Sequence, residues 1–213
     1  MAQLQLALDG DLSSALEILS AAHPYIDMAE IGTPLVFREG MAAVRRIREL
    51  YPQLTLVADL KIMDAGETEA DIAFSAGADV VTAMAAAADA TIASALGSAR
   101  AHGKRLLVDM MQVAHTKTRA RELADMGCDL LCLHTAHDQQ ALLGSPFAQL
   151  AALREALPTA DLAIAGGLKL PALEQILPLK PQVIIIGSAI TAASDPRASA
   201  IAFHERIRQY GNA

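Results

Sequence analysis

The segment 59–64, with the sequence DLKIMD, combines two carboxylates and one ammonium group within six residues. Asp59 and Lys61 are two positions apart, so on a β-strand their side chains point to the same face. Each favours the ionised form of the other, because opposite charges lie close together. A plain ion pair at a strand end is the simpler alternative, but the following carboxylate of Asp64 favours a site that does chemistry.

Further polar residues close other apolar runs of the chain. Asp9 closes the first run and Glu30 closes the second, while Asp59 belongs to the third. Two carboxylates such as Glu30 and Asp59, completed by water and substrate oxygens, suit a hard cation such as Mg²⁺. Mn²⁺ shares this ligand chemistry. Two solvated acids at the rim of a sheet are the alternative interpretation.

Asp109 and His134 close the fifth and sixth runs, so they come from neighbouring strands. A histidine side chain titrates near neutral pH, which makes His134 a candidate general acid and base. Isolated histidines are more often structural, but the position beside Asp109 favours a catalytic role. His137 follows three residues later, and the two histidines form only a weak zinc-ligand pattern.

Glycines follow the last two runs. Gly166 and Gly167 come after the seventh run, and Gly187 and Ser188 come after the eighth. Glycine lets backbone N–H groups approach an anion closely, and parallel barrels frequently bind phosphate at these two places. Tight turns alone would also use glycine. The chain has neither a Gly-x-Gly-x-x-Gly nor a Walker-type loop, so no nucleotide cofactor is implied.

Eight short apolar runs must position these residues, and helix-like stretches separate them. Each run is continuous rather than alternating, as expected for parallel strands covered on both faces. Eight βα units predict a single α/β domain over residues 1–213, a (β/α)8 TIM barrel, with an open doubly wound sheet as the alternative. In the barrel, all the polar strand ends would meet on one face. The runs are 4–8, 26–31, 54–60, 80–83, 106–110, 130–134, 162–165 and 183–186.

The composition excludes several classes of protein. Hydrophobic residues make up 53% of the chain and charged residues 19%, which excludes a disordered protein. The net charge of −7 makes nucleic acid and anionic membranes poor partners. Cys128 and Cys132 are too few for a disulfide scaffold, so we expect reduced cysteines and a cytoplasmic location. No apolar run reaches the length of a membrane span, and the start lacks a signal-peptide pattern.

Seven segments together resemble the 3-hexulose-6-phosphate synthases, a family in the orotidine 5′-monophosphate decarboxylase superfamily. They cover nearly the whole chain in order, and the Asp-x-Lys-x-x-Asp core is highly specific in this context. The segments are LALD at 6–9, EIGTP at 30–34, ADLKIMDAG at 58–66, VDM at 108–110, HT at 134–135, AGG at 165–167 and IGSAI at 186–190.

This resemblance implies a (β/α)8 homodimer with active sites at the subunit interface. The family condenses formaldehyde with D-ribulose 5-phosphate, reversibly and through an enediolate, into D-arabino-hex-3-ulose 6-phosphate. By resemblance, Mg²⁺ would be bound by Glu30 and Asp59, and Asp64 would enter the partner's site. His134 would be the acid and base, with help from Asp109. The substrate would contact Asp9, Lys61 and His137, and its phosphate would contact Gly166, Gly167, Gly187 and Ser188.

A close relative, 3-keto-L-gulonate 6-phosphate decarboxylase, shares the same core and is the first alternative. Its pattern has Glu, Arg, Thr and Arg where this chain has Asp109, His137, Ala165 and Ser188, so all four differences favour the synthase. The chain also departs from the synthase pattern at His137 and in the loop 83–88. A non-catalytic barrel that binds sugar phosphates is the second alternative.

Overall fold

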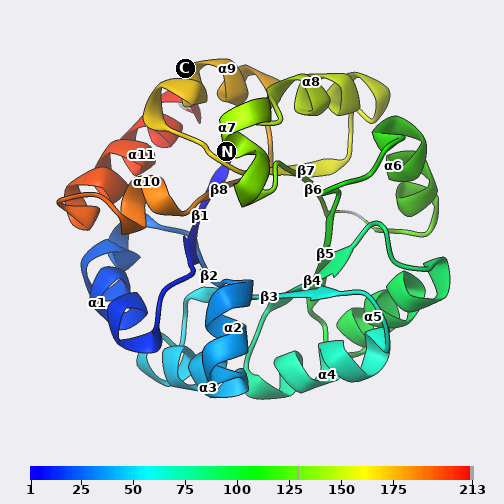
Figure 1. The fold of residues 1–213 in the computed structure, drawn as a ribbon, viewed down its shortest axis with the longest axis horizontal. Coiled ribbons are helices and arrows are strands. Elements are labelled where there is room, and N and C mark those ends of the chain that lie inside the picture. The colour runs from blue at the N-terminus through cyan, green and yellow to red at the C-terminus, as the bar shows by residue number, and fades with distance from the viewer. Residues whose placement is uncertain (129, 212–213) are drawn as a thin grey trace.

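The computed structural model describes residues 1–128 and 130–211, which form a closed barrel of parallel strands surrounded by helices (Figure 1). The strands pair in chain order, and the last strand pairs back with the first. The predicted (β/α)8 barrel is therefore confirmed, and the open doubly wound sheet is wrong. The strands are β1 (Gln3–Leu8), β2 (Met28–Ile31), β3 (Thr55–Ile62), β4 (Val80–Met84), β5 (Arg105–Asp109), β6 (Leu130–His134), β7 (Asp161–Ala165) and β8 (Val183–Ile186).

The apolar runs predict the strands to within one or two residues at each end. The largest differences fall on β2, which begins two residues later than expected, and on β3, which ends two residues later. The pairing of β3 with β4 shifts register between Ala58 and Ile62, and Ile62 then pairs with Ala83. This β-bulge carries β3 past the end of its apolar run.

Helices connect the strands on the outside of the barrel, as Figure 1 shows. Within the described part of the chain, no helix is both long and apolar enough to span a membrane. The α-helices are α1 (Leu12–Ala22), α2 (Thr33–Glu39), α3 (Met41–Leu50), α4 (Gly66–Ala76), α5 (Asp89–Ala101), α6 (Thr116–Asp125), α7 (Gln140–Leu143), α8 (Phe147–Ala156), α9 (Leu173–Ile176), α10 (Ser188–Thr191) and α11 (Pro196–Gly211). Short 3-10 helices are η1 (His23–Tyr25), η2 (His137–Gln139), η3 (Leu170–Ala172) and η4 (Leu177–Leu179).

The apolar side chains form two separate cores. The larger core lies between the strands and the helices and includes Leu6, Ile31 and Phe203. The smaller core fills the barrel interior and includes Val57 and Leu130. Successive side chains on a strand point to opposite faces, so each strand contributes to both cores. At the carboxyl ends of the strands, the inward-facing positions become polar and form the floor of a cavity.

Two arginines hold the loops that lead into β3 and β7. Arg48 lies in α3 and Arg154 lies in α8, and a proline follows each of them four residues later. Each guanidinium donates to the carbonyl oxygens four and six residues ahead, and also to a carbonyl oxygen near the start of the next strand. The acceptors of Arg154 are the carbonyl oxygens of Pro158, Ala160, Leu179 and Lys180, at 2.9–3.0 Å.

Candidate active site

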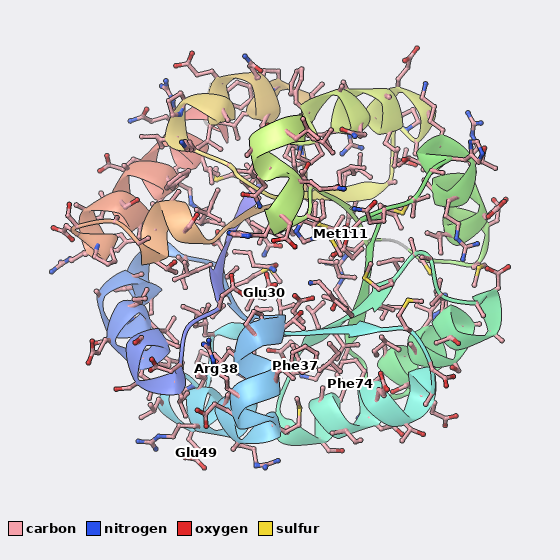
Figure 2. All side chains as sticks on the ribbon, in the orientation of Figure 1. Glu30, Phe37, Arg38, Glu49, Phe74 and Met111 are labelled. Atoms are coloured by element: carbon pink, nitrogen blue, oxygen red, sulfur yellow. The ribbon has the colours of Figure 1, made fainter. Side chains whose placement is uncertain are left out.

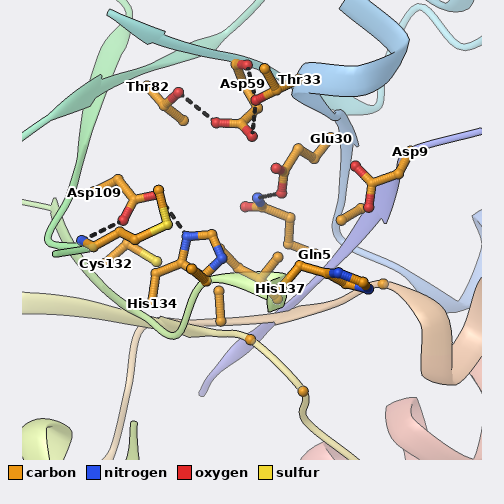
Figure 3. A pocket seen from close by; sticks show the side chains of 18 of the residues that line it. Gln5, Asp9, Glu30, Thr33, Asp59, Thr82, Asp109, Cys132, His134 and His137 are labelled. Carbon is orange, nitrogen blue, oxygen red and sulfur yellow. Dashed lines mark hydrogen bonds and ion pairs between the residues drawn. The ribbon is translucent and has the colours of Figure 1, made fainter. Parts of the chain in front are cut away.

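The carboxyl ends of the strands surround a cavity of about 650 Å³ (Figure 3). With one exception, the residues that the sequence predicts for the site line this cavity, although they come from segments spread over most of the chain. The exception is Asp64, which is exposed in the loop after β3. The predicted residues that line the cavity are Asp9, Glu30, Asp59, Lys61, Asp109, His134, His137, Gly166, Gly167, Gly187 and Ser188.

Asp59 is the most heavily hydrogen-bonded carboxylate of the cavity. Its Oδ1 accepts a hydrogen bond of 2.7 Å from Thr82 Oγ1, and its Oδ2 accepts one of 2.7 Å from Thr33 Oγ1. Lys61 Nζ donates to the same Oδ2. Burial alone would raise the pKa of Asp59, but the charge of Lys61 and these donors outweigh burial and lower it. Asp59 is therefore ionised at neutral pH.

Lys61 reaches the cavity from an unusual backbone conformation. Its φ is +50°, in the left-handed region that residues with a side chain rarely adopt, and it lies in the bulge of β3. Its N–H donates to Thr82 Oγ1 at 2.9 Å, which holds the bulge. Its ammonium group contacts Asp59 and lies 3.9 Å from Asp109 Oδ2. Burial opposes the charge of Lys61, but Asp59 outweighs it and raises the pKa of Lys61.

Glu30 is buried beside Asp59 and accepts a hydrogen bond from a neutral donor. Gln5 Nε2 donates to its Oε2 at 2.6 Å. Burial, and then the negative charge of Asp59, raise the pKa of Glu30 to about 8. Burial and Asp59 also raise the pKa of Asp9. The floor of the cavity thus concentrates more negative charge than Lys61 alone compensates.

The donor set of the floor fits a hard cation. A carboxylate offers about four lone-pair positions. Asp59 uses three of them, and Glu30 uses one, for the hydrogen bonds described above. The Gln5 Oε1 atom is also buried and has no hydrogen-bond partner in the described part of the chain. No group of three or more His, Cys, Asp or Glu side chains is arranged for a metal in residues 1–128 and 130–211, so the other ligands of a cation would be water and substrate.

His134 and Asp109 form a hydrogen-bonded pair from β6 and β5. His134 Nδ1 lies 2.7 Å from Asp109 Oδ2, while Asp109 Oδ1 accepts from the Met111 N–H at 2.8 Å. An ionised carboxylate only accepts hydrogen bonds, so His134 Nδ1 must carry the proton. The other ring nitrogen, Nε2, is then the free base in the neutral imidazole. This is the tautomer that proton abstraction requires.

The glycines after β7 are required by the close approach of the backbone of β6. Gly166 has φ +98° and Gly167 has φ +67°. A Cβ atom at Gly166 would lie 2.4 Å from the carbonyl oxygen of Thr135. After β8, Gly187 leads into the short helix α10, which begins at Ser188. The barrel thus has two backbone turns side by side on adjacent strands at the cavity.

Three cavity residues are absent from the sequence-based prediction: Gln5, Thr33 and Thr82. Gln5 and Thr82 are single polar residues inside apolar runs, a signal that the sequence already contains. Thr33 carries no such signal, because it begins α2 and is brought to Asp59 only by the fold. Cys132 also lines the cavity, and burial raises the pKa of its thiol well above the usual value, which favours the predicted packing role.

Known proteins resemble this chain over nearly its whole length. The profile described as "Orotidine 5'-phosphate decarboxylase / HUMPS family" matches residues 2–203. The chain is 42% identical over 208 residues to a 3-hexulose-6-phosphate synthase of Bacillus subtilis (strain 168), covering 97% of this chain and 99% of that protein. Among solved structures, 3-hexulose-6-phosphate synthase from Salmonella typhimurium has a TM-score of 0.95 at 38% identity, covering 98% of this chain and 99% of the other. KGPDC from Streptococcus mutans, in complex with ribose 5-phosphate, has a TM-score of 0.91 at 25% identity, covering 98% of both chains.

Proposed function

The chain belongs to the orotidine 5′-phosphate decarboxylase / HUMPS family, and on that premise we propose that it is a 3-hexulose-6-phosphate synthase. The reaction joins formaldehyde to C1 of D-ribulose 5-phosphate and gives D-arabino-hex-3-ulose 6-phosphate, reversibly. The observation that carries this proposal is the His134–Asp109 pair, which faces the same cavity as Lys61 and the two buried carboxylates Glu30 and Asp59.

The chemistry begins with loss of a proton from C1 of the sugar, beside its ketone. His134 Nε2 is the base, because Asp109 holds the proton of the ring on Nδ1. The electron pair left on the substrate gives an enediolate, and the ammonium group of Lys61 stabilises its negative charge. C1 then attacks the carbonyl carbon of formaldehyde, and the new alkoxide takes a proton, so that atoms and charge balance.

Mg²⁺ is the cofactor that we propose for this site, and Mn²⁺ is a substitute with the same ligand chemistry. Glu30 and Asp59 would hold it, since both are buried carboxylates with lone pairs left open. When bound, the cation acts as a Lewis acid that stabilises developing negative charge on oxygen. The raised pKa of Glu30, caused by burial and Asp59, supports this assignment, because a cation would relieve the repulsion.

The phosphate of the substrate is proposed to bind at the turns after β7 and β8. Gly166, Gly167, Gly187 and Ser188 line the cavity there, at a place that barrels frequently use for phosphate. Asp9 and His137 lie at the same cavity and would contact the sugar. A phosphate held away from the reacting carbon orients C1 toward His134.

A homodimer with shared sites is the proposed assembly. The Phe37 side chain on α2 is 85% exposed, and Met63 beside Asp64 is 53% exposed (Figure 2 shows Phe37). Large apolar side chains at this exposure favour a covered surface at this edge of the barrel mouth. Asp64 does not line the cavity of its own chain, which agrees with a role in the site of a partner subunit. We propose a cytoplasmic location, because the substrate is a phosphorylated metabolite.

The test is a comparison of two reactions with purified protein. Formaldehyde consumption is measured with D-ribulose 5-phosphate, and CO₂ release is measured with 3-keto-L-gulonate 6-phosphate. We expect formaldehyde consumption to dominate and to disappear with EDTA or in Asp59→Asn. Dominant CO₂ release would replace the proposal by the decarboxylase. Tight binding of the sugar phosphate without either reaction would favour a binding barrel.

A further inference from the structure

Gln5 is a polar side chain in the apolar interior of the barrel. It lies on β1, is 1% exposed and faces the cavity floor. Its register partner on β2 is Met28, which belongs to the apolar interior core. Burying an amide there is unfavourable unless hydrogen bonds compensate for the lost water. The proposed reaction assigns no role to Gln5.

The amide of Gln5 is only half satisfied by the protein. Its Nε2 donates to Glu30 Oε2 at 2.6 Å (Figure 3). Its Oε1 is the one buried side-chain oxygen or nitrogen without a partner among residues 1–128 and 130–211. Thr82 and Thr33, which fix Asp59 in the same cavity, have both of their hydroxyl groups engaged. An acceptor left open in a polar cavity is available to water or a ligand.

We propose that Gln5 is a positioning residue for Glu30, and this inference rests on the proposed function of the site. The Gln5 N–H fixes Glu30 Oε2, so that the other oxygen of Glu30 stays turned into the cavity to receive a divalent cation. The open Oε1 of Gln5 accepts a hydrogen bond from a water molecule in the same cavity. Thr33 and Thr82 act on Asp59 in the same way, so each of the two carboxylates has its own neutral support.

A purely structural role of Gln5 explains these contacts less well. An apolar side chain of similar length would fill the same space in the interior core without an open acceptor. Partners that orient a metal ligand typically change metal affinity by about 10- to 100-fold when they are removed. The two roles therefore predict different results for cation binding in a folded variant.

The experiment measures Mn²⁺ binding by the electron paramagnetic resonance signal of free Mn²⁺, without substrate. The variant is Gln5→Met, which has similar length but neither donor nor acceptor, and Gln5→Leu is a second variant should the first fail to fold. The control is Met28→Leu, a volume-conserving change in the register partner that leaves the Gln5–Glu30 hydrogen bond in place. Thermal unfolding without metal verifies that each variant is folded.

We expect a Kd for Mn²⁺ that is at least about tenfold higher in the Gln5 variant and within about twofold of wild type in Met28→Leu. The Mn²⁺ concentration for half-maximal activity should rise in parallel, while kcat at saturating Mn²⁺ stays within about threefold. Unchanged Mn²⁺ binding in the Gln5 variants would overturn the inference, and so would an equal loss in Met28→Leu or no binding by wild type. A wild-type protein that binds Mn²⁺ but lacks synthase activity would overturn the proposed function alone.

Discussion

Replacement of Asp109 by asparagine tests the role of the His134 pair most sharply. In wild type, the Met111 N–H binds Asp109 Oδ1 at 2.8 Å, which leaves Oδ2 facing His134 Nδ1 at 2.7 Å. An asparagine keeps the bond from Met111 by placing its amide oxygen there. Its NH₂ group then faces His134 Nδ1 and donates to it. His134 must therefore carry its proton on Nε2, the nitrogen that would have been the base.

The magnitude follows from the loss of one correctly protonated base. General acid–base catalysis typically contributes about 10²–10⁴ in rate, which corresponds to about 3–5 kcal/mol of activation free energy. We therefore expect kcat for formaldehyde consumption to fall by about 10²–10⁴ in Asp109→Asn. Exchange of the C1 proton of D-ribulose 5-phosphate with deuterium in the solvent, followed by NMR, should fall by a similar factor. KM should change little, because the shape and hydrogen-bond count of the side chain are kept.

The matched control is Asp161→Asn, at the start of β7 and outside the cavity, where Asp161 pairs with Arg105 at 3.0 Å. This pair is partly exposed, so its loss should leave kcat and C1 exchange unchanged. If Asp109→Asn retains kcat within about threefold of wild type, then His134 is not the base that this pair prepares, and the reasoning is refuted.

Three further predictions concern residues outside the acid–base pair. In Gly32→Ala, the new Cβ would lie 2.0 Å from Asp9 Oδ1, so Asp9 must move; steady-state kinetics should show KM for the sugar phosphate rising about tenfold, with little change in Tm. Burial opposes ionisation of Asp79, but the hydrogen bond from Lys104 helps to hold the pKa of Asp79 below its ordinary value. That stabilisation is complete above about pH 4 and is lost as the pH falls through the lower pKa of the folded state, so Asp79→Asn should flatten the fall of Tm between about pH 5 and pH 2. Arg154→Ala removes the donor to four carbonyl oxygens, and urea unfolding should show a free energy of unfolding lower by about 2–4 kcal/mol.

The strand pattern of the barrel was accessible from the sequence because buried parallel strands leave continuous apolar runs. The runs at 130–134 and 183–186 match β6 and β8 at both ends. The bulge in β3 was not accessible, because it depends on pairing with β4 and on the hydrogen bond between the Lys61 N–H and Thr82. The prediction that Lys61 and Asp59 point into the same cavity is nevertheless confirmed, although the strand between them is irregular.

The candidate site was predictable where residues carry charge at strand ends, and less so where neutral side chains support them. Gln5 and Thr82 face the cavity from inside apolar runs, and only the barrel shows that they touch Glu30 and Asp59. The role of Asp64 stays a prediction, since its side chain is exposed and does not line the cavity of its own chain. Mg²⁺ binding and dimerisation also stay predictions, because each depends on a component outside a single chain.

The most direct measurement of the central claim follows the new carbon–carbon bond itself. ¹³C-labelled formaldehyde is mixed with D-ribulose 5-phosphate, Mg²⁺ and the protein, and the label is followed by ¹³C NMR. Our account predicts that the formaldehyde signal is replaced by a CH₂OH carbon coupled to the former C1 of the sugar, and that Asp59→Asn abolishes this change. Label that stays in formaldehyde, with folded protein and Mg²⁺ present, would contradict the account.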